Sequence, residues 1–398
     1  MVNKFLYPRG GSESYMLYLG EYLKKLGHEL EYFGMYDEKN TVGNSAGLYT
    51  QNMDFHSSGL GRFLYPFKII YSFEAKKKIM QVIDNFKPDI VHMNNINFQL
   101  TPSIIHGIKK RGIPVVQTVH DYQMICPNHL LYNFDKNTPC EKCTGGSHIN
   151  CIKNRCIHGS LIKSIIGFIE AKFYRFVKTY KMVDLYVCPS NFLENKLISS
   201  KEFYKGKTLT IHNFIDKEKF SKVDCEKDDY IVYVGRLSKE KGVEHIAGVA
   251  KLLPEYTFVV AGSGPDEDIL KNNPNIKLAG FLTGEKLTEV MGKARVLLLP
   301  SVCYENCPLS ILEAHSMELP VVTMNSGGMA ELVKDGVTGS CVNEPTAEGI
   351  ALRLKETLEN EEYYNRLVEN CRKEKDNILS VETYSEILLK EYEKLVKR

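Results

Sequence analysis

Two carboxylates stand eight positions apart in the second half of the chain. Glu305 lies in a predicted loop after an apolar run, and Glu313 lies in the second turn of a predicted helix that starts at Pro308. An ionised carboxylate only accepts hydrogen bonds, which suits it to sugar hydroxyls. The N–H groups of Leu309 and Ser310 would be unpaired at the helix start and could hold an anion. The alternative interpretation is that both acids are ordinary solvated residues.

Two cations flank another loop of the second half. Arg236 and Lys241 follow the predicted strand that opens this half. Arginine grips phosphate oxygens with a forked guanidinium, and lysine adds a point charge. Together they can neutralise a departing diphosphate without a metal ion. Gly262 and Gly264 follow the next predicted strand, where glycine lets the backbone approach a base or a phosphate.

The first half carries a glycine turn and a histidine at the ends of predicted strands. Gly10 and Gly11 lie between a short strand and a helix, a layout that can present backbone N–H groups to a ligand. His120 ends the predicted strand at 113–119, the position where ligands bind in parallel sheets. Its imidazole can bond a sugar hydroxyl, and Asp121 could fix its tautomer. The alternative is a histidine satisfied by local backbone.

Five cysteines crowd into a predicted insert at residues 126–158. Cys126, Cys140, Cys143 and Cys156 are the predicted ligands of a structural zinc ion, with Cys151 as the alternative ligand. A Cys-x-x-Cys pair is typical of zinc knuckles, and a metal can stabilise a loop region with little core of its own. Free thiols and disulfides are the alternatives. A reducing compartment favours zinc over disulfides.

Apolar runs alternate with helical patterns along both halves, and these elements must position the residues above. The alternation predicts an α/β fold of parallel sheets with right-handed crossovers. We place a first Rossmann-like domain at residues 1–212 and a second at 213–378. The final segment, 379–398, is predicted to be a helix that crosses back to the first domain.

Residues 159–181 are predicted to form a basic amphipathic helix. Our first interpretation is a surface helix whose apolar stripe packs on the core, and the alternative is contact with an anionic membrane. Residues 60–80 are a second candidate for membrane contact. The apolar residues of the helix are Leu161, Ile165, Ile166, Ile169, Phe173 and Phe176, and its cations are Lys163, Lys172, Arg175, Lys178 and Lys181.

Composition restricts the class of protein. The net charge of +2 gives no case for a nucleic acid partner. No run of about 18 apolar residues is present, so no membrane span is expected. The N-terminus lacks a secretory pattern, so we expect a cytoplasmic protein. The first predicted strand is short, and the two interpretations are a natural start a few residues upstream of Met1 or a trimmed strand.

Five motifs occur in order along the chain, and together they resemble glycosyltransferase family 4. Members of this family are retaining enzymes of the GT-B fold, and the likeness is to bacterial surface-polysaccharide glycosyltransferases. It covers essentially the whole chain, and its specific part is the Glu-x7-Glu helix together with the Arg…Lys pair. The motifs are Pro8-Arg9-Gly10-Gly11-Ser12-Glu13, His120-Asp121, Gly235-Arg236-Leu237 through Lys241-Gly242, Gly262-Ser263-Gly264-Pro265 and Glu305-x7-Glu313.

The resemblance implies two Rossmann-like domains facing a central cleft, the second binding a nucleotide-sugar donor and the first an acceptor. Arg236 and Lys241 would then hold the diphosphate, and Glu313 the ribose hydroxyls. Glu305, with the backbone around Asn306 to Leu309, would hold the donor sugar. Gly11 would lie near the phosphate and the acceptor, and His120 near the donor sugar.

The implied activity is that of a retaining glycosyltransferase of the hexosyltransferase type. It would move a sugar from a nucleoside diphosphate, UDP rather than GDP, to a lipid-linked glycan acceptor in surface polysaccharide biosynthesis. No cofactor is expected for catalysis. The protein would work peripherally on the inner face of the plasma membrane. The alternatives are a GT-B sugar-nucleotide epimerase and a nucleotide-sugar-binding protein without turnover.

Overall fold

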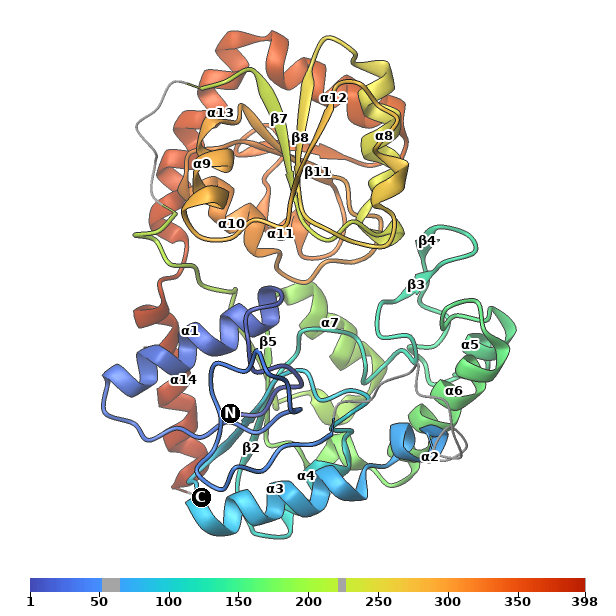
Figure 1. Cartoon of the computed structure of the whole chain (residues 1–398), viewed down its shortest axis with the longest axis vertical. Coiled ribbons are helices and arrows are strands. Elements are labelled where there is room, and N and C mark those ends of the chain that lie inside the picture. Colours follow the sequence, from blue (N-terminus) through green and yellow to red (C-terminus); the bar gives the residue numbers. More distant parts are fainter. Residues whose placement is uncertain (52–64, 221–226, 398) are drawn as a thin grey trace. The chain divides into compact units, whose positions relative to one another are not determined.

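The computed structural model describes residues 1–51, 65–220 and 227–397, which form two compact units (Figure 1). Unit 1 contains residues 1–131, 140–212 and 381–398. Unit 2 contains residues 132–139 and 213–380. The cysteine-rich insert, which we placed wholly in the first domain, is therefore divided between the units.

Unit 1 is built on a parallel sheet in the order β1-β2-β5-β6. Val2 adds to its edge through parallel bridges to Met93 and Phe33. β1, β2 and β5 are buried along their whole length, as expected of parallel strands covered on both faces. The strands are β1 (Val91–Met93), β2 (Val115–Thr118), β5 (Leu185–Cys188) and β6 (Thr208–Thr210).

Serine side chains start several helices of unit 1. Ser72, Ser160 and Ser190 accept hydrogen bonds from first-turn amides of α3, α6 and α7. The cap at Ser72 starts α3 as a helix separate from α2. The helices are α1 (Gly11–Lys25), α2 (Tyr65–Ile70), α3 (Phe73–Phe86), α4 (Ser103–Lys109), α5 (Ile149–Lys153), α6 (Leu161–Phe176), α7 (Asn191–Ser200) and α14 (Val381–Val396), with 3-10 turns η2 (Thr179–Met182) and η3 (Glu202–Tyr204).

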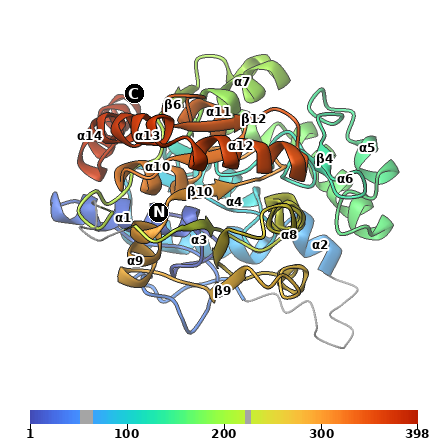
Figure 2. The same cartoon turned by 90° about the horizontal axis from the view of Figure 1, so that it is seen from above.

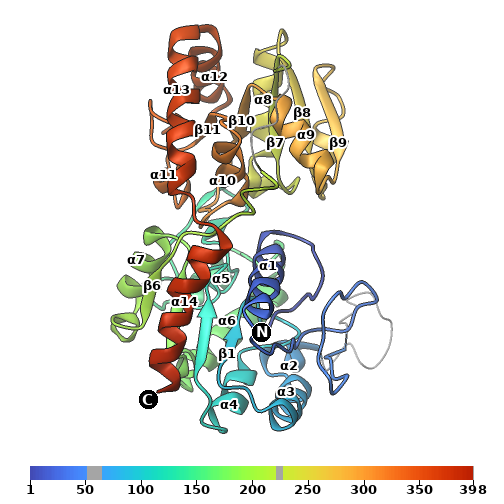
Figure 3. The same ribbon diagram turned by 90° about the vertical axis from the view of Figure 1, so that its left-hand side faces the viewer.

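The C-terminal helix α14 belongs to unit 1, and Figure 3 shows it running along this unit to the C-terminus. It packs against α1, where the Tyr15 and Tyr384 hydroxyls lie 2.7 Å apart. Tyr392 bonds Nδ1 of the buried His92. The predicted return of the last helix to the first domain is confirmed.

Unit 2 is a six-stranded parallel sheet in the order β12-β11-β10-β7-β8-β9. Strands β7, β8 and β9 follow one another toward one edge of the sheet, and β10, β11 and β12 follow one another toward the other edge. The strand order therefore reverses between the neighbours β7 and β10, which is the topological switch point. The strands are β7 (Tyr230–Val234), β8 (Thr257–Ala261), β9 (Ile276–Gly280), β10 (Val296–Leu299), β11 (Val321–Met324) and β12 (Gly339–Val342).

Helices cover both faces of this sheet. α8 packs against α12 on one face, and α10 packs against α13 on the other (Figure 1). The elements are α8 (Val243–Leu252), α9 (Glu285–Lys293), α10 (Leu309–Ser316), α11 (Met329–Leu332), α12 (Ala347–Glu359) and α13 (Glu361–Glu374), with 3-10 turns η4 (Lys239–Lys241), η5 (Glu267–Ile269) and η6 (Lys375–Asn377).

A small hairpin from the cysteine-rich insert completes unit 2. Its strands are β3 (Tyr132–Asn133) and β4 (Thr138–Pro139), which pair antiparallel. Asn137 Nδ2 donates to Glu244 Oε2 of α8 at 3.2 Å. Tyr132 is almost wholly buried. In the part of the chain that the structure describes, no helix is both long and apolar enough to cross a bilayer.

Candidate functional site

The loops after β7 and β10 form the edge of unit 2 where the strand order reverses. Parallel sheets bind ligands at the carboxyl ends of their strands at such a point. The two loops are tied together because the Glu240 carbonyl accepts from the amides of Val302 and Cys303, at 3.0 and 3.1 Å. This edge therefore brings residues 236–241 and 301–308 next to one another.

Lys241 and Glu305 form an ion pair at this edge. Lys241 Nζ donates to Glu305 Oε1 at 2.5 Å, and Ser301 Oγ donates to the same oxygen at 2.8 Å. Burial by itself lowers the pKa of Lys241, but the Glu305 carboxylate, together with Cys303 and Tyr233, more than offsets burial and the pKa is raised. Lys241 therefore stays charged. No further described group donates to the second oxygen of Glu305, which is left to accept from a ligand.

Arg236 is the second cation of the site. Its side chain is exposed, and within the described residues its guanidinium has no ion-pair or hydrogen-bond partner. Its carbonyl accepts from the Tyr233 hydroxyl at 2.8 Å, which fixes the backbone of the loop. The guanidinium is thus available for an anion.

The backbone at Gly262 and Gly264 packs closely against the backbone of the loop that carries Arg236. A Cβ at Gly262 would lie 1.8 Å from the Gly235 carbonyl oxygen, and one at Gly264 would lie 2.1 Å from that of Leu237. The Leu237 amide also donates to the Ser263 carbonyl at 3.0 Å. The close approach that these glycines permit is to the chain's own backbone, where we had expected a base or a phosphate.

Glu313 lies in the second turn of α10. No described group donates a hydrogen bond to its carboxylate. Burial raises the pKa of Glu313 to about 7, and Lys219 opposes this rise. An acceptor withdrawn from water without a donor is suited to the hydroxyls of a ligand.

The N-terminus of α10 is open. The helix begins at Leu309 after Pro308, and no side chain caps it. The amides of Leu309 and Ser310 can therefore meet an anion, as the sequence suggested. The site thus combines two cations, an uncapped helix start and two carboxylates within one unit.

The glycine pair Gly327-Gly328, which the site prediction did not include, supports the Glu305 loop. The Gly328 amide donates to the Glu305 carbonyl at 2.7 Å. A Cβ at Gly328 would lie 1.5 Å from the Asn306 carbonyl oxygen. The available signal was two consecutive glycines in the loop between β11 and α11, because only glycine allows this approach.

In unit 1, His120 and Asn94 follow neighbouring strands. His120 Nε2 lies 2.9 Å from Asn94 Oδ1. An amide oxygen only accepts, so Nε2 carries the proton. Burial lowers the pKa of His120 to about 4, which keeps the ring neutral. Asp121 instead bonds Asn97 Nδ2 at 3.0 Å, so the expectation that Asp121 fixes the His120 tautomer is wrong.

The glycine turn of unit 1 lies at the same edge of the sheet, because it follows Val2, which pairs with β1. Gly10 is the last residue before α1, which begins at Gly11, and no side chain caps this helix. The buried Glu13 carboxylate accepts from Asn3 Nδ2 at 3.3 Å and from Ser12 Oγ at 3.1 Å.

Lys4 is a further cation, half-buried, that the sequence did not reveal. Lys4 Nζ donates to Asn97 Oδ1 at 2.9 Å. Burial lowers the pKa of Lys4 to about 8, although Asp121 and Glu13 act to raise it. A charged group held inside a polar network marks this edge of unit 1 as a place for a polar ligand.

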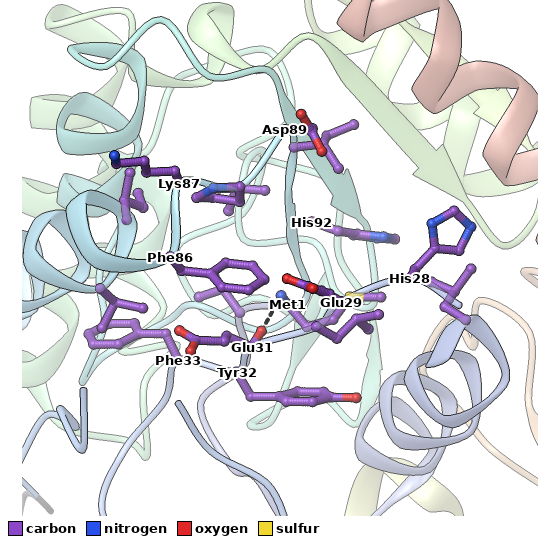
Figure 4. Close-up of a pocket in the computed structure, with 18 of the residues that line it drawn as sticks. Met1, His28, Glu29, Glu31, Tyr32, Phe33, Phe86, Lys87, Asp89 and His92 are labelled. Carbon is purple, nitrogen blue, oxygen red and sulfur yellow. Dashed lines mark hydrogen bonds between the residues drawn. The ribbon is translucent and has the colours of Figure 1, made fainter. Parts of the chain in front are cut away.

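A cavity of about 370 Å³ lies at the opposite edge of the unit 1 sheet, where strands begin (Figure 4). Two of the polar groups that line it are paired within the protein. The Met1 amine donates to the Glu31 carbonyl at 2.8 Å, and both nitrogens of His92 bond hydroxyls, those of Tyr392 and Thr118. We assign no ligand to it.

The cysteines of the insert lie close together. Cys143, Cys151 and Cys156 form one buried cluster, Cys126 is buried and Cys140 is half-buried. Every described cysteine is a free thiol, and burial raises the pKa of Cys126 and Cys143. Over the described ranges, no group of three or more His, Cys, Asp or Glu side chains is arranged to hold a metal ion. The zinc site stays a prediction.

Solved structures of the same architecture are glycosyltransferases of the GT-B fold. The structure of Anabaena Alr3699/HepE in complex with UDP-glucose has a TM-score of 0.71 at 15% identity, covering 99% of this chain and 98% of that chain. Sucrose-phosphate synthase from Thermosynechococcus elongatus has a TM-score of 0.72 at 16% identity, covering 99% and 96%. These likenesses show the fold that the sequence predicted.

Family models match nearly the whole chain. Residues 9–219 match Glycosyltransferase Family 4, and residues 214–374 match Glycosyl transferases group 1. The chain belongs to glycosyltransferase family 4, so the resemblance seen in the sequence is confirmed.

Two relatives extend over most of the chain. An uncharacterized 42.6 kDa protein in the cps region of Klebsiella pneumoniae is 26% identical over 349 residues, which are 83% of this chain and 86% of that protein. The sulfoquinovosyl transferase SQD2 of Arabidopsis thaliana is 24% identical over 380 residues, which are 90% of this chain and 65% of that protein.

Proposed function

We propose that the protein is a retaining hexosyltransferase that moves a sugar from a UDP-sugar to a lipid-linked glycan in surface polysaccharide biosynthesis. The observation that carries this proposal is the Lys241–Glu305 ion pair, which shares the switch-point edge of unit 2 with the free Arg236 and the uncapped start of α10. The Anabaena neighbour binds UDP-glucose, and the Klebsiella relative is a protein of a cps region; both support the choice of donor and pathway.

Unit 2 supplies the groups for the donor. Arg236, Lys241 and the first amides of α10 take up the charge of the diphosphate as it leaves. Glu313 accepts from the ribose hydroxyls, and the second oxygen of Glu305 accepts from a hydroxyl of the donor sugar. Because these fixed charges already oppose the phosphate charge, the reaction proceeds without a divalent metal ion.

Unit 1 supplies the groups for the acceptor and the reacting sugar. A neutral His120 adds no positive charge beside a sugar that becomes positively charged as its bond to phosphate breaks. The acceptor hydroxyl attacks from the face that the diphosphate leaves, so the anomeric configuration is retained.

We also propose that the insert holds a structural zinc ion through Cys126, Cys143 and Cys156, with Cys140 or Cys151 as the fourth ligand. The burial of four of these thiols in one small region supports this. Their side chains must rotate to converge on a metal ion. The role of such an ion is structural, and no step of the transfer depends on it.

The test is sugar transfer from UDP-sugars to a lipid-linked acceptor in EDTA. We expect transfer in EDTA, and UDP to raise the melting temperature more than GDP or ADP. Loss of transfer that only manganese restores would reject the metal-free mechanism. Release of a free sugar or an epimer without acceptor would identify an epimerase, and UDP binding without transfer or hydrolysis would identify a binding protein.

A further inference from the structure

Helix α6 presents its apolar side to solvent. The residues that it buries are Ser164, Gly167, Glu170 and Tyr174. Its exposed side carries Leu161, Ile162, Ile165, Ile169 and Phe176, and Ile162 and Phe176 are 71% and 84% exposed. A surface helix of a globular protein normally does the reverse. Our first interpretation, that this stripe packs on the core, is therefore wrong.

The inversion has a local cause. A Cβ at Gly167 would lie 2.4 Å from Ile157 Cδ1, so the small-residue side of the helix is needed for close packing against the insert. On the same side, Glu170 Oε1 lies 3.5 Å from Gln123 Nε2, and the Tyr174 hydroxyl donates to the Ile70 carbonyl of α2. The fold thus uses the polar side of α6 and leaves the apolar side without a partner within the described residues.

Neighbouring elements continue this apolar surface. Phe67 of α2 is 71% exposed, Phe73 at the start of α3 is 77% exposed, and Ile149 of α5 is also exposed. The Tyr71 ring links Phe73 to α6, since its centroid lies 4.7 Å from that of Phe73 and 6.0 Å from that of Phe173. α2 and α5 both contact α6, and the three gather at one end of unit 1 (Figures 1 and 2). We name this surface, made by Phe67, Phe73, Ile149 and the exposed side of α6, the α2–α6 face.

The segment that contains α5 and α6 is strongly positive. The segment 142–183 contains eight cations and one carboxylate, the buried Glu170, so its net charge is 8 − 1, or +7. The whole chain carries +2, so the remaining residues sum to −5. None of these cations forms an ion pair with a residue that the structure describes. They are Lys142, Lys153, Arg155, Lys163, Lys172, Arg175, Lys178 and Lys181.

We propose that the α2–α6 face docks on an anionic lipid bilayer, with its apolar side chains at the boundary of headgroups and acyl chains and its cations against the headgroups. An amphipathic helix of this kind lies in the plane of the interface. The positive charge favours an anionic bilayer over a second copy of the chain, because a second copy would bring one positive face against another. The proposal extends the lipid-linked acceptor proposed above by naming the surface that meets the membrane.

The test is flotation with vesicles of phosphatidylcholine alone or with about one third phosphatidylglycerol, without donor or acceptor. We expect binding to the anionic vesicles only, weakened by high salt because surface charges are screened. Each cation removed in Lys163→Gln and Lys172→Gln should weaken binding about fivefold. Ile162→Glu with Phe176→Glu should abolish it, while Leu352→Glu, a matched exposed site on α12, should leave it unchanged.

Two results would overturn the docking proposal. One is equal binding of the wild-type protein and the Ile162→Glu, Phe176→Glu variant to anionic vesicles. The other is a wild-type dimer that this variant converts to a monomer, since the face would then join subunits. Transfer to a water-soluble acceptor analogue should be equal in both proteins. Absence of transfer in both would reject the proposed function and leave the vesicle result standing.

Discussion

Replacing Glu313 by glutamine is expected to stabilise the protein at alkaline pH and to weaken donor binding. The carboxylate is withdrawn from water, has no donor among the described residues and has a pKa raised by burial from 4.5 to about 7. Glutamine keeps the shape of the side chain and cannot ionise. The substitution therefore separates two effects of the Glu313 carboxylate: the stability that is lost by burying its charge, and the affinity that the charge gives for a ligand.

The size of the effect follows from proton linkage. A rise of 2.5 units in the pKa of Glu313 corresponds to at most about 3.5 kcal/mol at about 1.4 kcal/mol per unit. Partial exposure of the side chain reduces this to about 1–2 kcal/mol. The folded protein holds the proton more tightly than the unfolded chain. Proton binding at Glu313 therefore makes its full contribution to the free energy of unfolding below pH 4.5, and this contribution is lost as pH rises through 7.

Urea unfolding of both proteins at pH 4 and pH 8 measures this. We expect the Glu313→Gln variant to match the wild-type protein at pH 4 and to be about 1–2 kcal/mol more stable at pH 8. Its affinity for UDP at pH 8 should fall about tenfold to a hundredfold, since one or two charge-assisted hydrogen bonds are lost. Glu344→Gln, at an exposed position of unit 2, is the control. A stability difference that does not change with pH, or unchanged UDP affinity, would refute the reasoning.

Three further predictions concern the other site residues. Glu305→Gln leaves the Lys241 ammonium without its partner, so the free energy of unfolding should fall by about 1–3 kcal/mol and transfer should be lost; wild-type kinetics would contradict the donor site. Asn94→Asp places a carboxylate against the His120 ring, which should raise its pKa above about 4 and move the acid limb of the kcat/KM profile upward, whereas Asn94→Ala should not; NMR titration of His120 checks this. Metal analysis should find one zinc per chain in the wild-type protein and less in Cys140→Ser if Cys140 is a ligand; zinc-free wild-type protein with reduced thiols would reject the metal site.

The sequence predicted local elements well and pairings across elements poorly. Proline at 308 and the apolar spacing after it located α10 and hence Glu313. The Lys241–Glu305 contact spans 64 positions and depends on β10 lying beside β7, which the sequence does not state. Asn94 escaped attention for the same reason, because it meets His120 only when β1 and β2 pair.

Helix α6 shows a different limit. Helical spacing correctly grouped Leu161, Ile165, Ile169 and Phe176 on one side. It could not tell which side the rest of the fold would cover. That choice was made by Gly167, whose lack of a side chain admits Ile157, and by the partners of Glu170 and Tyr174. Periodicity therefore predicts which residues share a side, and packing decides which side is buried.

The β3–β4 hairpin affects how the protein can be divided or recombined. The polypeptide passes from one unit to the other after residues 131, 139, 212 and 380, so neither unit is a continuous stretch of sequence. Expression of residues 213–380 alone would omit Tyr132 and Asn137 and uncover the surface of α8 that they contact. A chimera that exchanges donor specificity between family members must transfer residues 132–139 together with the second half of the gene product.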